Sequence, residues 1–322
     1  MRFLLSAEQR QFADSLHDLL SASDVPTVVR HWRSGDSAPG IALWRKLAAT
    51  GVTALAGSDG DPVDLVVAFE QLGRHVVPGP LVESAAVVPT LLAALPDTGL
   101  AERWLPELAS GTSIATVAIP PNVPYALDAD VADLVLAVDG DLLSTGHITG
   151  SELSSVDGAR RLFAVAPDTA LARCVTGPAS DIGTLVCAAQ LLGAGRAVLD
   201  MAVGHARARK QFGRPIGAFQ AVKHQLADVL VGIELARPLL YGAAVTMARR
   251  DISAAKVACG DAAHRAARVT LQVHGAVGYT DEHDLSLWLT KIRALCGAWG
   301  TGSVHRARVL AALVDRGETP CG

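Results

Sequence analysis

Two segments in the second half of the chain carry residue types that could bind a phosphorylated, aromatic ligand. The first holds Arg209, Gln211, Phe212 and Gln220. A guanidinium is a planar, permanent cation that suits a pyrophosphate, an aromatic ring offers a flat face, and a carboxamide both donates and accepts hydrogen bonds. Taken singly, each has an ordinary alternative, since Arg209 could be a solvated charge at a helix end and Phe212 could lie in the core.

The second segment, residues 272–279, holds Gln272, Gly275 and Gly278. Glycines let a backbone approach a phosphate without an intervening side chain. The alternative is a surface glutamine followed by two glycines that simply end a helix. The two segments together favour a binding site.

Composition excludes several classes of protein. Of 322 residues, 50% are hydrophobic and 19% are charged, which is enough for a large core, and the net charge of −4 gives no basic footprint for nucleic acid. We expect no signal peptide and no membrane span, because no charge-free apolar run reaches the ~18 residues required. Five scattered cysteines indicate a reduced, cytoplasmic protein, and the ten histidines show no metal-ligand spacing.

Apolar periodicity divides the chain into three parts. Residues 1–111 are predicted to be helical, beginning with a capping box between Ser6 and Gln9. Short apolar runs over residues 112–178 predict a small antiparallel sheet. Residues 179–322 predict long helices. Gly193 and Gly195 lie inside one of these helical patterns with no strand before them, so we interpret them as sites of close helix packing.

This order resembles the acyl-CoA dehydrogenase family. Residues 209–216 are similar to its RxQFGxPI signature, residues 272–279 to its QxxGGxGY turn with Ala276 in place of the second glycine, and residues 70–74 to a common N-terminal segment. The resemblance implies a mainly α fold, with an N-terminal helical domain, a middle β domain and a C-terminal four-helix bundle. It also implies FAD as cofactor, with the arginine and the aromatic of the first signature reaching across a subunit interface to the FAD of a neighbour.

The family's catalytic carboxylate is missing. It abstracts a proton next to the thioester and usually lies in an EGTxQIQR stretch, where this chain has Trp299. An indole can donate a hydrogen bond but cannot accept the proton. The alternative position of the base aligns with Gly183. Nearby, Asp181 is predicted to be a helix N-cap. Trp299 either lines the vacated pocket or fills the core.

The middle segments at residues 115–122 and 144–149 have also lost the family pattern. The chain therefore resembles the non-catalytic subunit of the heteromeric α₂β₂ acyl-CoA dehydrogenases of bacterial steroid side-chain degradation. That resemblance implies a homologous catalytic partner, an acyl-CoA substrate, and an electron-transfer flavoprotein as acceptor. Two alternatives remain. One is a self-sufficient homomeric dehydrogenase whose base is displaced to Asp181 or Glu282. The other is a non-enzymatic acyl-CoA-binding scaffold that has lost flavin.

Overall fold

The computed structural model describes residues 4–57 and 60–315. Its first part is helical, as predicted, and the Ser6–Gln9 capping box forms. The elements are α1 (Ala7–Ser21), α2 (Val25–Arg33), α3 (Ala38–Ala49), α4 (Pro62–Arg74), the π-helical turn η2 (Glu83–Val87), α5 (Val88–Ala93) and α6 (Gly99–Ser110). Gly111 then ends α6 in the left-handed region, at φ 68°.

The middle part is a four-stranded sheet in the order β1-β3-β4-β6. The strands of this part are β1 (Ala115–Ala118), β2 (Ala126–Leu127), β3 (Leu134–Asp139), β4 (Leu142–Ile148), β5 (Leu162–Phe163) and β6 (Val165–Arg173), with β2 and β5 forming a separate pair. The expectation of a purely antiparallel sheet is wrong, because β1 runs parallel to β3. Residues 119–133 give the chain enough length for the crossover that a parallel pair requires.

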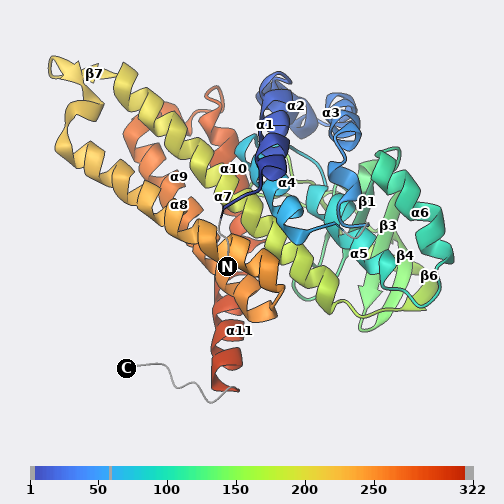
Figure 1. Cartoon of the computed structure of the whole chain (residues 1–322). Coiled ribbons are helices and arrows are strands. Elements are labelled where there is room, and N and C mark those ends of the chain that lie inside the picture. Colours follow the sequence, from blue (N-terminus) through green and yellow to red (C-terminus); the bar gives the residue numbers. More distant parts are fainter. Residues whose placement is uncertain (1–3, 58–59, 316–322) are drawn as a thin grey trace.

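The last part is a bundle of long helices (Figure 1). It consists of α7 (Gly177–Ala208), α8 (Gln220–Thr246), α9 (Arg249–His274), α10 (Leu285–Gly297) and α11 (Gly302–Val314). The first four pack on one another, and α11 packs on α9 and projects from the bundle. The expected fold, a helical domain, a small β domain and a four-helix bundle, is confirmed, and its elements change type close to residues 111 and 178.

Glycines on α4 and α7 let these two helices approach closely. A Cβ atom added to Gly193 would lie 1.9 Å from the carbonyl oxygen of Glu70, and one added to Gly73 would lie 2.1 Å from that of Gln190. Gly195 is likewise close to Ala263 on α9. These positions need glycine because backbone, not side chain, occupies the space, which agrees with the close packing predicted for residues 193–195.

Asp181 is not the N-cap that the sequence predicted. Helix α7 begins one turn earlier, at Gly177, with Thr176 as the preceding residue. Asp181 therefore lies within the helix, where its carboxylate is 3.6 Å from the guanidinium of Arg249. Burial raises the pKa of this carboxyl, although Arg249 and Arg308 favour its ionised form.

Two helices are long and apolar enough to cross a membrane on length and composition alone. In α7, 94% of the most apolar stretch is buried inside the bundle, so the core accounts for its composition. In α8 only 39% is buried. Its exposed apolar side chains include Val231, Leu235 and Leu239, which recur every four residues along one face.

Candidate functional site

The first predicted binding segment forms a short hairpin at the end of the bundle, between α7 and α8 (Figure 1). Strands β7 (Lys210–Gln211) and β8 (Arg214–Pro215) pair antiparallel. Phe212 and Gly213 connect them with φ angles of 52° and 79°, the sign that a two-residue type I′ turn requires at both positions. A positive φ is energetically unfavourable for a bulky residue such as phenylalanine. The Phe212 ring is nevertheless 90% exposed, with only an edge contact to Phe219 at a centroid distance of 6.1 Å.

Among the described residues the ring makes only this edge contact, so the aromatic face is free to meet a ligand or another chain. The neighbouring Arg209 is exposed and fixed only through its backbone, whose N–H donates to His205 O at 2.8 Å. Its side chain has no hydrogen bond or ion pair with any residue that the structure describes. Gln211 and Gln220 are also exposed, and Gln220 is 3.1 Å from the ring of His224.

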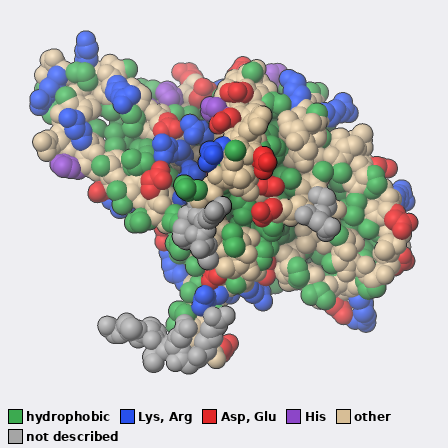
Figure 2. All heavy atoms as spheres, in the orientation of Figure 1, with side chains coloured by type: hydrophobic (Ala, Val, Ile, Leu, Met, Phe, Trp, Pro, Cys, Tyr) green, Lys and Arg blue, Asp and Glu red, His purple; other side chains and the backbone are tan. Residues whose placement is uncertain are grey.

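The hairpin end of the molecule is basic. Residues 201–227 contain five lysines and arginines and no carboxylate. Figure 2 shows blue side chains gathered on this projecting end of the bundle. Its exposed face therefore suits an anion such as a phosphate.

The second predicted segment lies at the carboxyl end of α9. Gln272 and Gly275 line an open cavity of about 710 Å³, together with Arg265, Arg268 and Tyr279. Gly275 ends the helix at φ 67° and ψ −145°, a conformation essentially restricted to glycine, and a Cβ atom there would meet open space. Its backbone is therefore open to a ligand.

Gly278 has a different position from Gln272 and Gly275. It is buried, and a Cβ atom there would lie 3.0 Å from Leu271 and 3.3 Å from Leu285. Its structural role is to allow the turn η5 (Gly275–Tyr279) to pack on the chain's own helices. The glycine pattern alone could not separate this role from approach to a ligand.

A stack of imidazoles holds the two segments at the same end of the bundle. The rings of His205 on α7 and His274 on α9 are stacked at 4.3 Å, and His283 meets His274 edge-on at 5.3 Å. Burial lowers the pKa of both His205 and His274. Arg209 follows His205 by one helical turn and Gln272 precedes His274 by two residues, so the stack joins α7 and α9 close to both segments.

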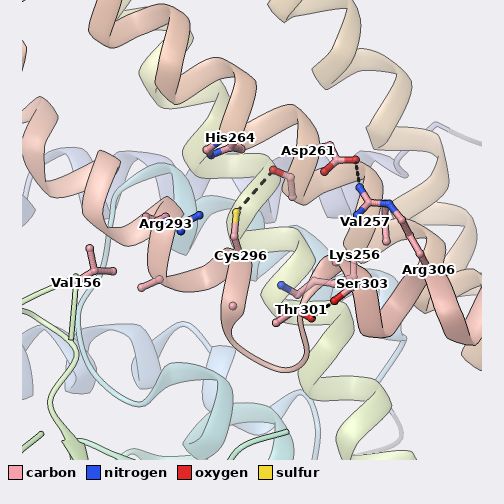
Figure 3. A pocket seen from close by; sticks show the side chains of 14 residues that line it. Val156, Lys256, Val257, Asp261, His264, Arg293, Cys296, Thr301, Ser303 and Arg306 are labelled. Carbon is pink, nitrogen blue, oxygen red and sulfur yellow. Dashed lines mark hydrogen bonds and ion pairs between the residues drawn. The ribbon is translucent and has the colours of Figure 1, made fainter. Parts of the chain in front are cut away.

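A second cavity, of about 570 Å³, continues along α9 toward α10 and α11 (Figure 3). Asp261 and His264 line both cavities, so the two form one groove. In the second cavity the Arg306 guanidinium pairs with Asp261 at 2.7 Å, while Arg293 is exposed. The length of the groove and its cations suit an extended anionic ligand.

Trp299 and Gly183, the two positions where the family would carry its base, lie against each other. The indole is 4% exposed, and a Cβ atom on Gly183 would lie 2.7 Å from two of its ring carbons. Trp299 therefore fills core space that only a glycine at position 183 leaves open. It both packs in the core and forms one wall of a small remaining cavity, so the two alternatives for Trp299 hold together.

That remaining cavity, of about 210 Å³, lies at the junction of the three parts of the chain. It is smaller than the roughly 300–1,000 Å³ typical of ligand pockets. One of its walls holds Glu83, a carboxylate that the sequence reasoning missed. Glu83 is 1% exposed and lies on the π turn η2. A π-helical turn is frequent at functional sites, but nothing in the local sequence marks one here.

Burial raises the pKa of the Glu83 carboxyl, although Arg160, its own backbone N–H, Trp299 and Lys291 favour the ionised form. The indole N–H of Trp299 is close enough to influence this carboxyl but does not reach hydrogen-bond geometry. Trp299 Nε1 and Glu83 Oε2 both lack a partner among the described residues.

The two displaced bases considered from the sequence lie elsewhere. Asp181 pairs with Arg249, and Glu282 is exposed in the loop after η5. Neither lines the cavity beside Trp299. The structure therefore does not bring a replacement carboxylate from either position to the place of the missing base.

Sequence models of two protein families match this chain. The N-terminal domain of acyl-CoA dehydrogenases matches residues 6–112, and their C-terminal domain matches residues 180–314. The acyl-CoA dehydrogenase IpdE2 of Mycobacterium tuberculosis is 31% identical over 293 residues, covering 88% of this chain and 90% of the relative. This chain belongs to the acyl-CoA dehydrogenase family.

Other relatives and solved structures agree with this membership. IpdE2 of Mycolicibacterium smegmatis is 30% identical, over 89% of this chain and 93% of the relative. The butyryl-CoA dehydrogenase of Megasphaera elsdenii has the same fold, with a TM-score of 0.84 at 21% identity over 98% of this chain and 100% of that one. A chain of the ChsE4–ChsE5 complex of Mycobacterium tuberculosis has the same fold, with a TM-score of 0.83 at 23% identity over 100% of both chains.

FAD is the cofactor of this member of the family, and the described residues of the chain fit one half of FAD better than the other. Arg209, Gln272 and the open backbone at Gly275 offer donors and space for a diphosphate, and the α9 groove suits a nucleotide. The 210 Å³ cavity beside Trp299 does not fit a flavin ring together with an acyl thioester. When bound, FAD accepts the hydride from the substrate.

His305 holds the backbone of Trp299 and makes stability depend on pH. It is fully buried, and its Nε2 donates to Trp299 O at 3.0 Å while Nδ1 accepts from Ser253 Oγ at 3.2 Å. Burial lowers its pKa to about 4, so the folded protein keeps this imidazole neutral. The unfolded chain takes up the proton first as the pH falls below 6.5, which destabilises the fold.

We expect this histidine to remove about 3 kcal/mol from the free energy of unfolding between pH 6.5 and pH 4. Urea denaturation at a series of pH values measures the loss for the natural protein and for His305→Asn side by side. The asparagine cannot titrate, so its curve should fall less steeply on acidification, even though the variant is less stable at pH 7. Parallel curves for the two proteins would show that His305 is not held neutral.

Proposed function

We propose that this chain is the non-catalytic subunit of a heteromeric acyl-CoA dehydrogenase. In this proposal it completes the FAD site of a homologous catalytic partner, which supplies the carboxylate base and holds the flavin ring. The pair desaturates an acyl-CoA thioester between its α and β carbons. The observation that carries the proposal is the contrast between the exposed groups of the two signature segments and the space filled by Trp299 at the position of the base.

The exposed groups support the first half of this proposal. Arg209 is a permanent cation with no hydrogen bond or ion pair to a side chain in residues 4–57 or 60–315, and Phe212 has a positive φ and is almost fully exposed. Such groups are stabilised when a neighbouring subunit brings a diphosphate and an aromatic ring to them. In the complex, Arg209 and Gln272 would bind and orient the partner's FAD, and Phe212 would help to exclude water from it.

The closed site supports the second half. Trp299 and Gly183 leave no carboxylate at either base position and fill the space between them. An indole N–H cannot abstract the substrate proton. This chain can therefore bind and position, but the proton transfer needs a group from the partner.

The exposed face of α8 supports association with another subunit. Val231, Leu235 and Leu239 are 55%, 67% and 49% exposed on a helix that continues from the hairpin. A contiguous apolar face rimmed by polar residues is typical of a protein interface. The face is continuous with the hairpin, which supports an interface at which Arg209 and Phe212 would meet the partner.

Similar proteins support the assembly and the substrate class. The chain shares its fold with the ChsE4–ChsE5 complex and, at a TM-score of 0.84 and 21% identity, with a variant of the Tcur3481–Tcur3483 steroid ACAD. We propose a bulky steroid side-chain acyl-CoA as substrate and an electron-transfer flavoprotein as the electron acceptor. Because α7, the most apolar helix, is a core helix, we keep the expectation of a cytoplasmic protein without a membrane span.

The ratio of flavin to protein tests the proposal. Absorbance should show a colourless protein when this chain is purified alone, and about one FAD per pair when it is purified with its catalytic homologue. One FAD per chain in the isolated protein would instead support a self-sufficient homomeric enzyme. No flavin in either preparation would support an acyl-CoA-binding scaffold. Either of these results would overturn the shared site.

A further inference from the structure

The small cavity beside Trp299 has the properties of a ligand site in its own right. Its apolar wall comes from the loop after β1, from β2 and β5, and from the end of α10. The apolar residues on this wall are Val123, Pro124, Leu127, Leu162, Ala294 and Ala298. Its polar wall carries Glu83, Arg160 and Trp299. At about 210 Å³ the cavity is smaller than pockets for drug-sized ligands, so it suits a ligand of under about ten non-hydrogen atoms.

Three polar groups that lie close together on the cavity wall make no hydrogen bond within the described ranges, and two of them end in fully buried atoms. The Arg160 side chain is 9% exposed and makes no hydrogen bond or ion pair within the described ranges. Trp299 Nε1 and Glu83 Oε2 are likewise unpaired there. Buried polar groups in native proteins almost always have a partner, so unpaired ones at a cavity indicate a bound molecule. Two of the three groups are N–H donors, one of them a cation.

No carboxylate in the described ranges forms an ion pair with Arg160, although Glu83 lies close enough for Arg160 to favour its ionised form. Lys291, also buried, donates to Val77 O at 3.2 Å, and Arg161 is occupied by Asp128 and Asp130. Asp157 accepts the N–H of Ala159 through one carboxylate oxygen. The remaining carboxyl that faces the cavity is Glu83, whose pKa burial raises, so it can carry a proton and act as a third donor.

We propose that this cavity binds a small monocarboxylic acid of about five carbons, with its carboxylate on Arg160 and Trp299 and its alkyl chain against the apolar wall. A guanidinium matches a carboxylate with two parallel hydrogen bonds, and the indole adds a third. The site adjoins the α9 groove, with Ala294 and Gly297 at the end of α10 between them, but the groups that would hold the carboxylate, Arg160 and Trp299, line only the small cavity. The inference therefore does not depend on a shared FAD site.

Isothermal titration of the full chain with sodium valerate, without flavin, tests this site. Valerate has seven non-hydrogen atoms, and valeramide is a neutral control of the same size. We expect one valerate to bind per chain in the millimolar range, with valeramide at least about tenfold weaker, because a charge-assisted pair is lost. Absence of saturable valerate binding, or equal binding of valeramide, would mean that ordered water alone fills the cavity.

Substitutions in the cavity wall test which side chains contact the bound valerate. Arg160→Met keeps the length of the side chain but should weaken valerate binding about tenfold or more, and Trp299→Phe, which loses one N–H, about three- to tenfold. Glu83→Gln should keep the affinity, because a carboxamide also donates. Arg173→Met, an exposed arginine on β6, is the matched control. Unchanged valerate affinity in Arg160→Met would contradict the proposal. If this variant does not fold, the affinity of Trp299→Phe and the comparison with valeramide still test the site.

Discussion

Replacing Arg209 by alanine should strip flavin from the complex with the catalytic subunit. The guanidinium is exposed at the end of α7, has no partner among the described side chains, and lies in a stretch without carboxylates. A charge-assisted contact to a diphosphate contributes about 1.5–3 kcal/mol, which corresponds to roughly a ten- to hundredfold weaker binding of FAD. The flavin absorbance of the purified complex, and its loss on dilution, measure this change.

Arg207→Ala is the matched control for this experiment. Arg207 lies two residues earlier on the same last turn of α7 and is also exposed, so its replacement removes the same charge from the same end of the bundle. Flavin should be retained in this variant. Equal retention in Arg209→Ala and Arg207→Ala would show that the signature arginine does not contact FAD. Equal loss in both would indicate a general electrostatic effect.

Gly193→Ala should strongly destabilise the fold. The added Cβ atom would lie 1.9 Å from Glu70 O and 2.8 Å from both Arg74 N and Glu70 C, and these are backbone atoms that cannot turn aside. Helices α4 and α7 must then separate, and with them the buried core that joins the N-terminal part to the bundle. Forcing a methyl group into a packed core costs about 1–3 kcal/mol, and contact with backbone places this site at the upper end.

Gly204→Ala is the internal standard for Gly193→Ala. It lies on the same helix, is exposed, and an added Cβ atom would meet nothing within 4 Å. Because alanine is a better helix former than glycine, this change should be neutral or stabilise by up to about 1 kcal/mol. Urea denaturation of both variants separates the packing effect from helix propensity. Equal stabilities for the two would contradict the close approach of α4 and α7.

Local features of the sequence were sufficient to predict much of the fold. The capping box at Ser6, the helical periodicity and the paired glycines each describe interactions within a few residues or a requirement of the backbone itself. The two signature segments also indicated the family, and alignment with the family then predicted that no base lies at Trp299 or Gly183. The error at Asp181 arose because a carboxylate near a helix start looks like a cap, while its pairing with Arg249 is a contact between distant segments.

What the sequence alone determined, then, is the family and the helical elements, while the flavin-binding role of the two signatures and the lack of a carboxylate base stay predictions. Only the tertiary structure decided that β1 pairs parallel with β3, that the Trp299 indole lies on Gly183, and that Glu83 and Arg160 meet at one cavity. These contacts join residues far apart in the chain. They depend on how three packed parts share one core, which no local pattern of residues encodes.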